Sequence, residues 1–337
     1  MSQGNTRHRP SSRPAPPPAE RGRPGVSTLI VLFLAFFALA LAILLRTFVA
    51  GQMLVAPANQ YSEAELQAAN ATYFDATTAQ ARTGATLTLT STLRGDVKAA
   101  KDGNVVWDTF LALEDLQNGK QIQFSEDRLA FDRKTARLVN CCDAKAKVPA
   151  GGEPVYGLFF PIGIEKKTYS VYDSSTKKAW PMRFEGTETK NGTEVYRFVQ
   201  QIDETNTGPY TRPVPSTLLG LPGESREVPV DNYYRATVTS WIEPRSGITV
   251  DRRQQVTSTL KGQDGQGQLV VADIDLRMME KTQKDLADKA DSTAVAAAFL
   301  RTIGPAVSLG VSVLLFVLGA VLLVRHRRTK ALAGEPF

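Results

Sequence analysis

Histidine is nearly absent from this chain of 337 residues, which has only His8 and His326, one near each end. The long stretch between them therefore cannot hold a Ser-His-Asp or Cys-His catalytic site, nor a zinc ion bound through histidine. We also find no glycine-rich phosphate loop of the P-loop or dinucleotide type. These absences exclude several common hydrolase and nucleotide-binding sites, and we expect no metal ion, no cofactor and no enzymatic activity.

Cysteine is equally scarce, and its two positions, Cys141 and Cys142, are adjacent. In an oxidising compartment they can form a disulfide between neighbouring residues. The alternatives are two free thiols or a bridge between chains. We favour a structural kink over a redox function.

Two apolar runs without a single charge stand near the ends of the chain, at Val26–Leu45 and Ile303–Val324. A helix of about 20 residues spans the hydrocarbon core of a bilayer, which is roughly 30 Å thick. Basic residues precede the first run and follow the second, which predicts that both termini are cytoplasmic. A cleaved signal peptide is the alternative for the first run, but its apolar part is about twice as long as a usual signal core.

The predicted organisation is therefore a two-span protein of the plasma membrane with its main domain outside the cytoplasm. The segments are a disordered cytoplasmic tail (1–25), a transmembrane helix (26–45), an extracytoplasmic β-rich domain (47–302), a second transmembrane helix (303–324) and a cytoplasmic tail (325–337). The net charge of +6 comes from the basic tails, because ten of the 40 Lys and Arg residues but only two of the 34 acidic residues lie outside 47–324. The domain is thus close to neutral, and we expect no nucleic-acid partner.

The domain sequence alternates apolar and polar residues and is punctuated by Asp-Gly and Asn-Gly turn signals, which predicts antiparallel strands and hairpins. Strand-like runs are 85–93, 105–113, 121–124, 167–172, 182–187, 194–202, 233–242, 248–257 and 268–277. The Ser62–Glu65 capping-box pattern predicts a short helix reaching about Asn70. The proline-rich residues 203–232 predict a long exposed loop, and 278–300 predicts a helix.

Two residue sets are candidates for function. The first is an aromatic and apolar region that either fills the β core or lines a cavity for a lipid acyl chain: Phe159, Phe160, Ile162, Trp180, Phe184, Tyr196 and Phe198. The second is Asp273 and Asp275, which would share one face of a strand and suit a cation site or an acid/base pair. The alternative for this pair is a solvated strand face.

Six motifs in order resemble the actinobacterial envelope proteins known as PorA-type porins, a domain of formally unknown function. They are ATYFDATT (71–78), TSTLRGD (90–96), AFDRKTARLVNCC (130–142), FFPIGIEKKTYSVYD (159–173), EGTETKNGTEVYRF (185–198) and WIEPRSGITVD (241–251). The resemblance implies an envelope protein of high-GC Gram-positive bacteria, some of whose members are linked to lipoglycan assembly and lipid binding. The layout also looks like the CD36 class, whose β-rich ectodomain holds a lipid tunnel between two spans, and this implies a tunnel by analogy alone.

We favour a non-enzymatic, membrane-anchored protein that binds or passes an envelope lipid or glycolipid, with the plasma membrane and that lipid as its partners and protein partners unknown. The alternatives are a porin or channel component, a carboxylate-based enzyme acting on envelope glycans, and a scaffold that binds only proteins. A membrane barrel needs strands of about ten residues with apolar lipid-facing sides. The short, charge-rich strands of this sequence favour a domain that lies in water.

Overall fold

The computed structural model describes residues 25–149 and 151–332, without side-chain detail for 329–332. These residues divide into two compact units, one made of the terminal helices and the other of Leu45–Ile303. Each unit is described by itself.

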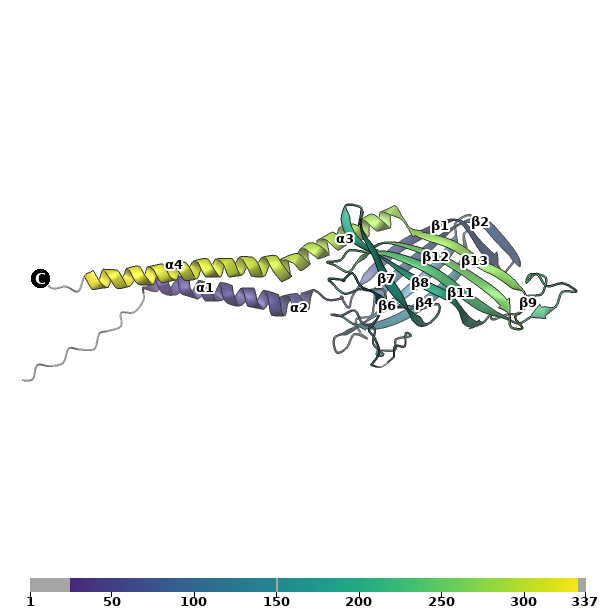
Figure 1. Cartoon of the computed structure of the whole chain (residues 1–337), viewed down its shortest axis with the longest axis horizontal. Helices are drawn as coiled ribbons and strands as arrows, with labels where there is room; N and C mark the ends of the chain where they lie inside the picture. Colours follow the sequence, from purple (N-terminus) through teal and green to yellow (C-terminus); the bar gives the residue numbers. More distant parts are fainter. Residues whose placement is uncertain (1–24, 150, 333–337) are drawn as a thin grey trace, which may run out of the picture. The chain divides into compact units, whose positions relative to one another are not determined.

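The helical unit contains α1 (Val26–Leu44) and α4 (Gly304–Leu332), which lie side by side in Figure 1. Ser312 Oγ donates a hydrogen bond to the Ala35 carbonyl at 2.9 Å, and the rings of Phe36 and Phe316 meet edge to face. A Cβ atom on Gly319 would come within 2.7 Å of the Leu32 side chain, so any larger residue there would require that side chain to shift.

Large apolar side chains such as Phe33, Phe37 and Leu314 point outward from these helices, with 69%, 58% and 71% of their surface exposed. The helical segments Val26–Met53 and Glu280–Arg328 are long and apolar enough to cross a membrane. Exposed apolar surface on a long helix is stable in lipid and costly in water. The protein is therefore a membrane protein.

The second unit is built on one large antiparallel sheet (Figure 1). In spatial order its strands are β4 (Lys120–Asp132), β3 (Asn104–Asp115), β2 (Gln80–Gly95), β1 (Tyr61–Asp75), β13 (Gln268–Met278), β12 (Thr249–Gly262), β11 (Val230–Ile242), β8 (Thr193–Pro209), β7 (Lys178–Lys190), β6 (Tyr169–Asp173) and β5 (Val155–Tyr156). Among the strands that the structure describes, β5 and β6 alone pair in parallel. The mainly antiparallel β domain expected from the alternating pattern is confirmed, as are its two flanking apolar helices.

The remaining elements of this unit are short or helical. They are the π-helical turn η1 (Leu45–Val49), α2 (Ala50–Met53), the hairpin of β9 (Val214–Pro215) and β10 (Glu227–Val228), α3 (Glu280–Ala298) and the π-helical turn η2 (Phe299–Ile303). Of the predicted turns, Asp102-Gly103 and Asn191-Gly192 have positive φ at both central residues, as type I′ hairpin turns require.

Two local predictions were wrong. Ser62–Asn70 is part of strand β1 and not a helix, because Leu66 and Ala68 alternate with polar residues and pack into the sheet core. Residues 203–232 are not one exposed loop, because β8 continues to Pro209 and the β9–β10 hairpin buries Val214 and Val228 against the sheet. The prolines sit at strand ends or in the short hairpin, where a missing amide donor is tolerated.

A short segment, Arg137–Val139, joins the two outermost strands of the sheet at one end. The amide of Val139 donates to the Ala130 carbonyl of β4 at 2.9 Å, and the amide of Leu138 donates to the Val155 carbonyl of β5 at 2.8 Å. Isolated bridges pair Phe131 with Leu138 and Arg137 with Tyr156. The sheet therefore curls until its edges meet at this end, and we call Arg137–Val139 the seam.

Candidate functional site

The curled sheet has an inner face and an outer face, which the strand register assigns residue by residue. Residues paired across antiparallel strands share a face, so Val238, Gln254 and Leu276 lie together and their neighbours in sequence lie opposite. The inner face is the buried one: along β11 it carries Tyr234, Ala236, Val238, Ser240 and Ile242, all buried. On β4 and β6, at opposite sides of the sheet, Asp127 and Asp173 also belong to this face.

Asp127 is half-buried on the inner face, and its pKa reflects this position. Burial raises the pKa of the Asp127 carboxyl, and the negative charge of Asp173 raises it further. These residues lie on strands far apart in the sheet order, so they interact only because the sheet curls around this face.

Part of the inner face is apolar but incompletely covered. Leu66, Leu87 and Ile274 are buried in one core cluster, and Ile202 and Ala236 are buried in another. Four apolar inner-face residues on β2, β3 and β12 are only half-buried, although three of them pack against core clusters, and we call this set the inner apolar strip: Leu89, Leu93, Leu111 and Val256. Its surface can accept apolar atoms from a ligand without displacing a core residue.

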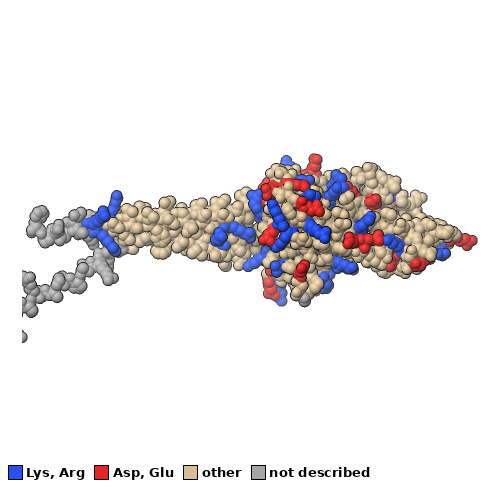
Figure 2. All heavy atoms as spheres, in the orientation of Figure 1, with Lys and Arg blue, Asp and Glu red and all other residues tan. Residues whose placement is uncertain are grey.

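The outer face is charged. Arg128 forms ion pairs with Asp96 at 2.7 Å and with Asp108 at 2.8 Å, and Arg253 pairs with Asp275 at 2.7 Å. Figure 2 shows acidic and basic side chains interspersed over the β-sheet unit, whereas most of the visible surface of the helical pair carries neither. An outer face of this kind is stable in water and would be costly against lipid tails.

Five of the seven predicted lipid-binding residues gather at the end of the sheet that the seam closes. Phe160 and Phe198 are buried in one core cluster, and Phe159, Phe184 and Tyr196 pack against it with part of their surface exposed. Their rings meet mostly edge to face, as in the Phe184–Phe198 and Phe184–Tyr196 pairs. These five residues, which we call the basal aromatic cluster, are packed side chains that fill the end of the curled sheet.

The other two predicted residues lie apart from this cluster. Ile162 packs with Leu54 and Ala297 near the start of the unit. Trp180 is half-buried beside Ile202 and Tyr234 on the inner face, and its indole nitrogen donates to Thr176 Oγ1 at 3.0 Å. Trp180 is thus the predicted residue that lies with the half-buried part of the inner face.

A polar group on the inner face was missed from the sequence. Arg252 Nη2 donates to Gln254 Oε1 at 3.3 Å, and Gln254 Nε2 donates to the Tyr234 hydroxyl at 3.5 Å. Burial raises the pKa of the Tyr234 phenol to about 12, so this side chain is protonated at neutral pH. The alternation along the strand predicts that Arg252 and Gln254 share one face. Only the pairing register shows that this face is the inner one.

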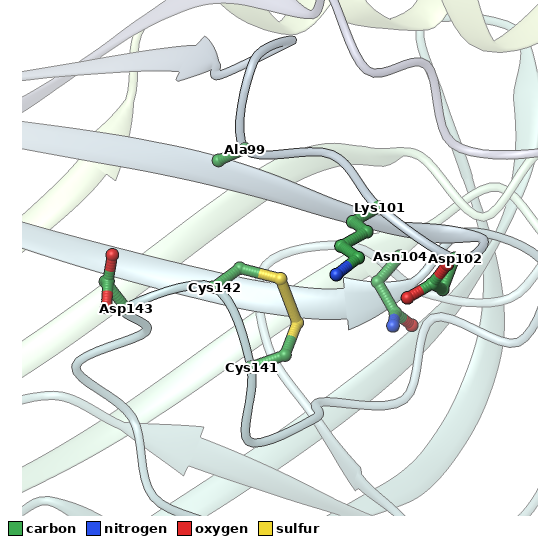
Figure 3. Close-up of a pocket in the computed structure, with 7 residues that line it drawn as sticks. All are labelled: Ala99, Lys101, Asp102, Asn104, Cys141, Cys142 and Asp143. Carbon is green, nitrogen blue, oxygen red and sulfur yellow. A yellow bond between two sulfur atoms is a disulfide. The ribbon is translucent and has the colours of Figure 1, made fainter.

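Cys141 and Cys142 form a disulfide that lines an open pocket of about 430 Å³ (Figure 3). Lys101, Asp102 and Asn104 lie on the other side of the pocket, and the disulfide faces them. Both cysteines also pack against the buried residues Val106 and Ala130, next to the seam. The packing of the two cysteines thus holds the segment that follows the seam against the sheet.

Asp273 and Asp275 are on the outer face and are not arranged as an acid/base pair. Asp273 is exposed, whereas Asp275 accepts two hydrogen bonds from Arg253 at 2.7 and 2.8 Å. The hydrogen bonds from Arg253 hold the pKa of Asp275 below its ordinary value. In the described ranges no three His, Cys, Asp or Glu residues come together in a way that could hold a metal ion.

Comparison with known proteins identifies the family. The family described as Porin PorA matches residues 27–321. A protein named Porin PorA from Corynebacterium amycolatum is 27% identical in an alignment of length 164 that covers 39% of this chain and 42% of the relative. A second Porin PorA, from Corynebacterium resistens, is 23% identical in an alignment of length 187 that covers 39% of this chain and 45% of the relative. Each alignment thus spans less than half of the relative's length. Because the family match covers the first apolar run, the whole curled sheet and most of the second run, the chain belongs to the PorA porin family.

Proposed function

We propose that this protein is a non-enzymatic component of the cell envelope, anchored in the plasma membrane, whose inner face binds an acyl chain of a lipid or glycolipid. The observation that supports this most is the contrast between the two faces of the sheet. The inner apolar strip is half-buried, whereas the outer face carries ion pairs. Apolar surface left open on the inside of a curled sheet is a favourable environment for a chain of methylene groups.

The basal aromatic cluster and the seam limit how far such a chain can enter. They fill one end of the curled sheet, so a ligand lies along the inner apolar strip and Trp180 and not among Phe160 and Phe198. In this proposal both termini are cytoplasmic and residues 47–302 are outside, where envelope lipids are accessible. A role in lipoglycan or envelope assembly would follow from delivering or holding such a lipid.

A channel is the second candidate, because the matched relatives are named porins. A sheet that lined a membrane pore would need apolar side chains on its outer face. The outer ion pairs of Arg128 and Arg253 oppose that arrangement. A pore made by the helices or by several copies of the chain would remain compatible with this outer face.

Native mass spectrometry of the full chain, purified in detergent and incubated with an envelope lipid extract, tests the proposal. We expect a stoichiometric lipid on the wild-type protein. The variant Val256→Asp places a charge on the inner apolar strip and should lower lipid occupancy at least about tenfold, since burying an unpaired carboxylate is costly. The adjacent variant Thr257→Asp, on the outer face, is the matched control and should keep the lipid.

A second inner-face variant distinguishes a loss of lipid binding caused by a blocked site from one caused by misfolding. Leu111→Trp narrows the inner face without adding charge, and it should also displace the lipid while the thermal unfolding midpoint stays close to that of the wild type. A wild-type protein that stays free of lipid, or one that conducts ions in planar bilayers while binding none, would overturn the proposal in favour of a scaffold or a channel.

A further inference from the structure

Arg252 is a half-buried cation without a carboxylate partner. Its Nε atom is inaccessible to solvent and has no hydrogen-bond partner, and its guanidinium makes one long hydrogen bond, to Gln254. Within the part of the chain that the structure describes, no Asp or Glu oxygen lies within 4.0 Å of its nitrogen atoms. Burial accordingly lowers the pKa of the Arg252 guanidinium, although arginine remains charged at neutral pH.

The neighbouring residue in sequence shows the contrast. Arg253, on the outer face, forms a two-pronged pair with Asp275 through Nε and Nη2. Arg252, on the inner face, forms no such pair with a carboxylate. Leaving a buried charge uncompensated is unfavourable, so the arrangement stabilises the fold little and suits a binding role.

Asp173 is the acidic group whose charge acts on Arg252, and it does not complete a pair. Its Oδ1 atom accepts hydrogen bonds from the Thr176 amide at 2.7 Å and from Thr176 Oγ1 at 2.8 Å. Those bonds orient the carboxylate toward its own turn. Tyr234, which is protonated at neutral pH, accepts a hydrogen bond from Gln254, so its hydroxyl belongs to the same polar group as Arg252 and Gln254.

We propose that Arg252, with Gln254 and Tyr234, forms a site on the inner face for an anionic group, a carboxylate or a phosphate, carried by an amphiphile. The planar guanidinium presents donors in the geometry that such oxyanions accept. Val256, two residues beyond Gln254 on the same strand, and Trp180 both pack against the cluster that contains Tyr234, and they provide apolar surface on the same face. This assignment rests on the proposed function and adds the charge class of the ligand: an acidic lipid, with its head at Arg252 and its chain on the inner apolar strip.

Fluorescence titration of the full chain in nanodiscs, with empty nanodiscs subtracted, tests the assignment. The probe is cis-parinaric acid, and its methyl ester is the uncharged counterpart. Wild-type protein should bind the acid at least about tenfold more tightly than the ester, because hydrogen bonds to charged groups contribute more than neutral ones. Arg252→Gln should remove that preference while leaving ester binding unchanged, Arg252→Lys should keep part of it, and Arg253→Gln should behave as wild type.

Competition identifies the source of the anion. Dodecyl phosphate should displace the acid, whereas inorganic phosphate at the same concentration should not, if the anion belongs to a lipid. Equal displacement by inorganic phosphate would overturn the assignment to an amphiphile. Equal binding of acid and ester by the wild type would overturn the anion site but keep the proposed function, whereas binding of neither probe would overturn both.

The thermal unfolding midpoint distinguishes a binding role of Arg252 from a purely structural one. Without a ligand, Arg252→Gln should be at least as stable as the wild type, because it removes a partly buried charge that has no carboxylate within ion-pair distance. A strong loss of stability in Arg252→Gln would show that Arg252 holds the fold together and would count against a binding role.

Discussion

At the residue scale, adjacent side chains in this protein meet opposite surroundings. Arg252 and Arg253 are indistinguishable by residue type, yet one lies on the inner face without a carboxylate partner and the other is held by Asp275 on the outside. Asp273 and Asp275, two residues apart, do share a face, as expected, but that face is the outer one. Strand parity shows which residues share a face, and only pairing with distant strands decides which face is enclosed.

Asp75 provides a test at this scale, through the dependence of stability on pH. Its buried carboxylate accepts hydrogen bonds from Lys120 Nζ and from the Thr77 amide, and Arg82 lies 3.4 Å away. The bond from Lys120, helped by the Thr77 amide, holds the pKa of Asp75 below its ordinary value. A carboxyl whose folded-state pKa is depressed contributes stability above its unfolded pKa of about 3.9 and loses it as the pH falls toward the folded value.

We therefore expect Asp75→Asn to lower the thermal unfolding midpoint at pH 7, and the difference from wild type to shrink as the pH is lowered below about 4. Differential scanning fluorimetry from pH 7 to pH 3 measures this. Asp203→Asn, at an exposed carboxylate on β8, is the control and should change little at any pH. A constant difference across the whole range would contradict the electrostatic account.

At the scale of elements, turns and close approaches set where the strands end and what they touch. Gly247, between β11 and β12, has φ of +73°, and a Cβ atom there would lie 2.5 Å from the Phe160 carbonyl oxygen. The turn therefore lies directly against the backbone of Phe160, a residue of the basal aromatic cluster. Gly103, between β2 and β3, has φ of +82°, and a Cβ atom there would meet nothing within 4 Å, so this position needs glycine for backbone conformation alone.

These two glycines make a matched pair for a stability measurement. Gly103→Ala should cost about 1–2 kcal/mol of unfolding free energy, the usual cost of a left-handed conformation for a residue with a Cβ atom. Gly247→Ala should cost clearly more, since the methyl group also clashes with the Phe160 backbone. Chemical denaturation of both variants measures the difference. Equal losses of unfolding free energy in the two variants would show that the Phe160 segment can move away from the turn at little cost.

At the scale of the whole molecule, the charge pattern around the two apolar runs predicts the side on which each part lies. In a Cys141→Ser, Cys142→Ser background, a new cysteine at the exposed residue Ser225 should react with a membrane-impermeant thiol reagent on intact cells from which the outer envelope layers have been made permeable. A cysteine at Ser12 should react only after the plasma membrane is opened. Labelling of Ser12→Cys before that step would contradict cytoplasmic termini and the proposed location of the sheet.

The sequence by itself determined the elements whose signal is local. The two apolar helices follow from uninterrupted runs of apolar residues, and most strands follow from alternation along a single segment. The motif order also led to the correct family. The local signal failed where two local patterns competed: the Ser62–Glu65 cap pattern lost to the alternation of Leu66 and Ala68, which pairing with β2 and β13 stabilises.

Only the tertiary structure decided how the strands close and what the inner face contains. The seam joins Ala130 of β4 to Val155 of β5 through Leu138 and Val139, a contact between opposite edges of the sheet that no local pattern encodes. That closure packs the basal aromatic cluster as a core, separates Trp180 and Ile162 from it, and leaves Arg252 on the inner face without a carboxylate partner. Each of these outcomes depends on contacts between residues far apart in the chain, because burial and ion pairing are properties of the assembled sheet and not of the segment that carries the residue.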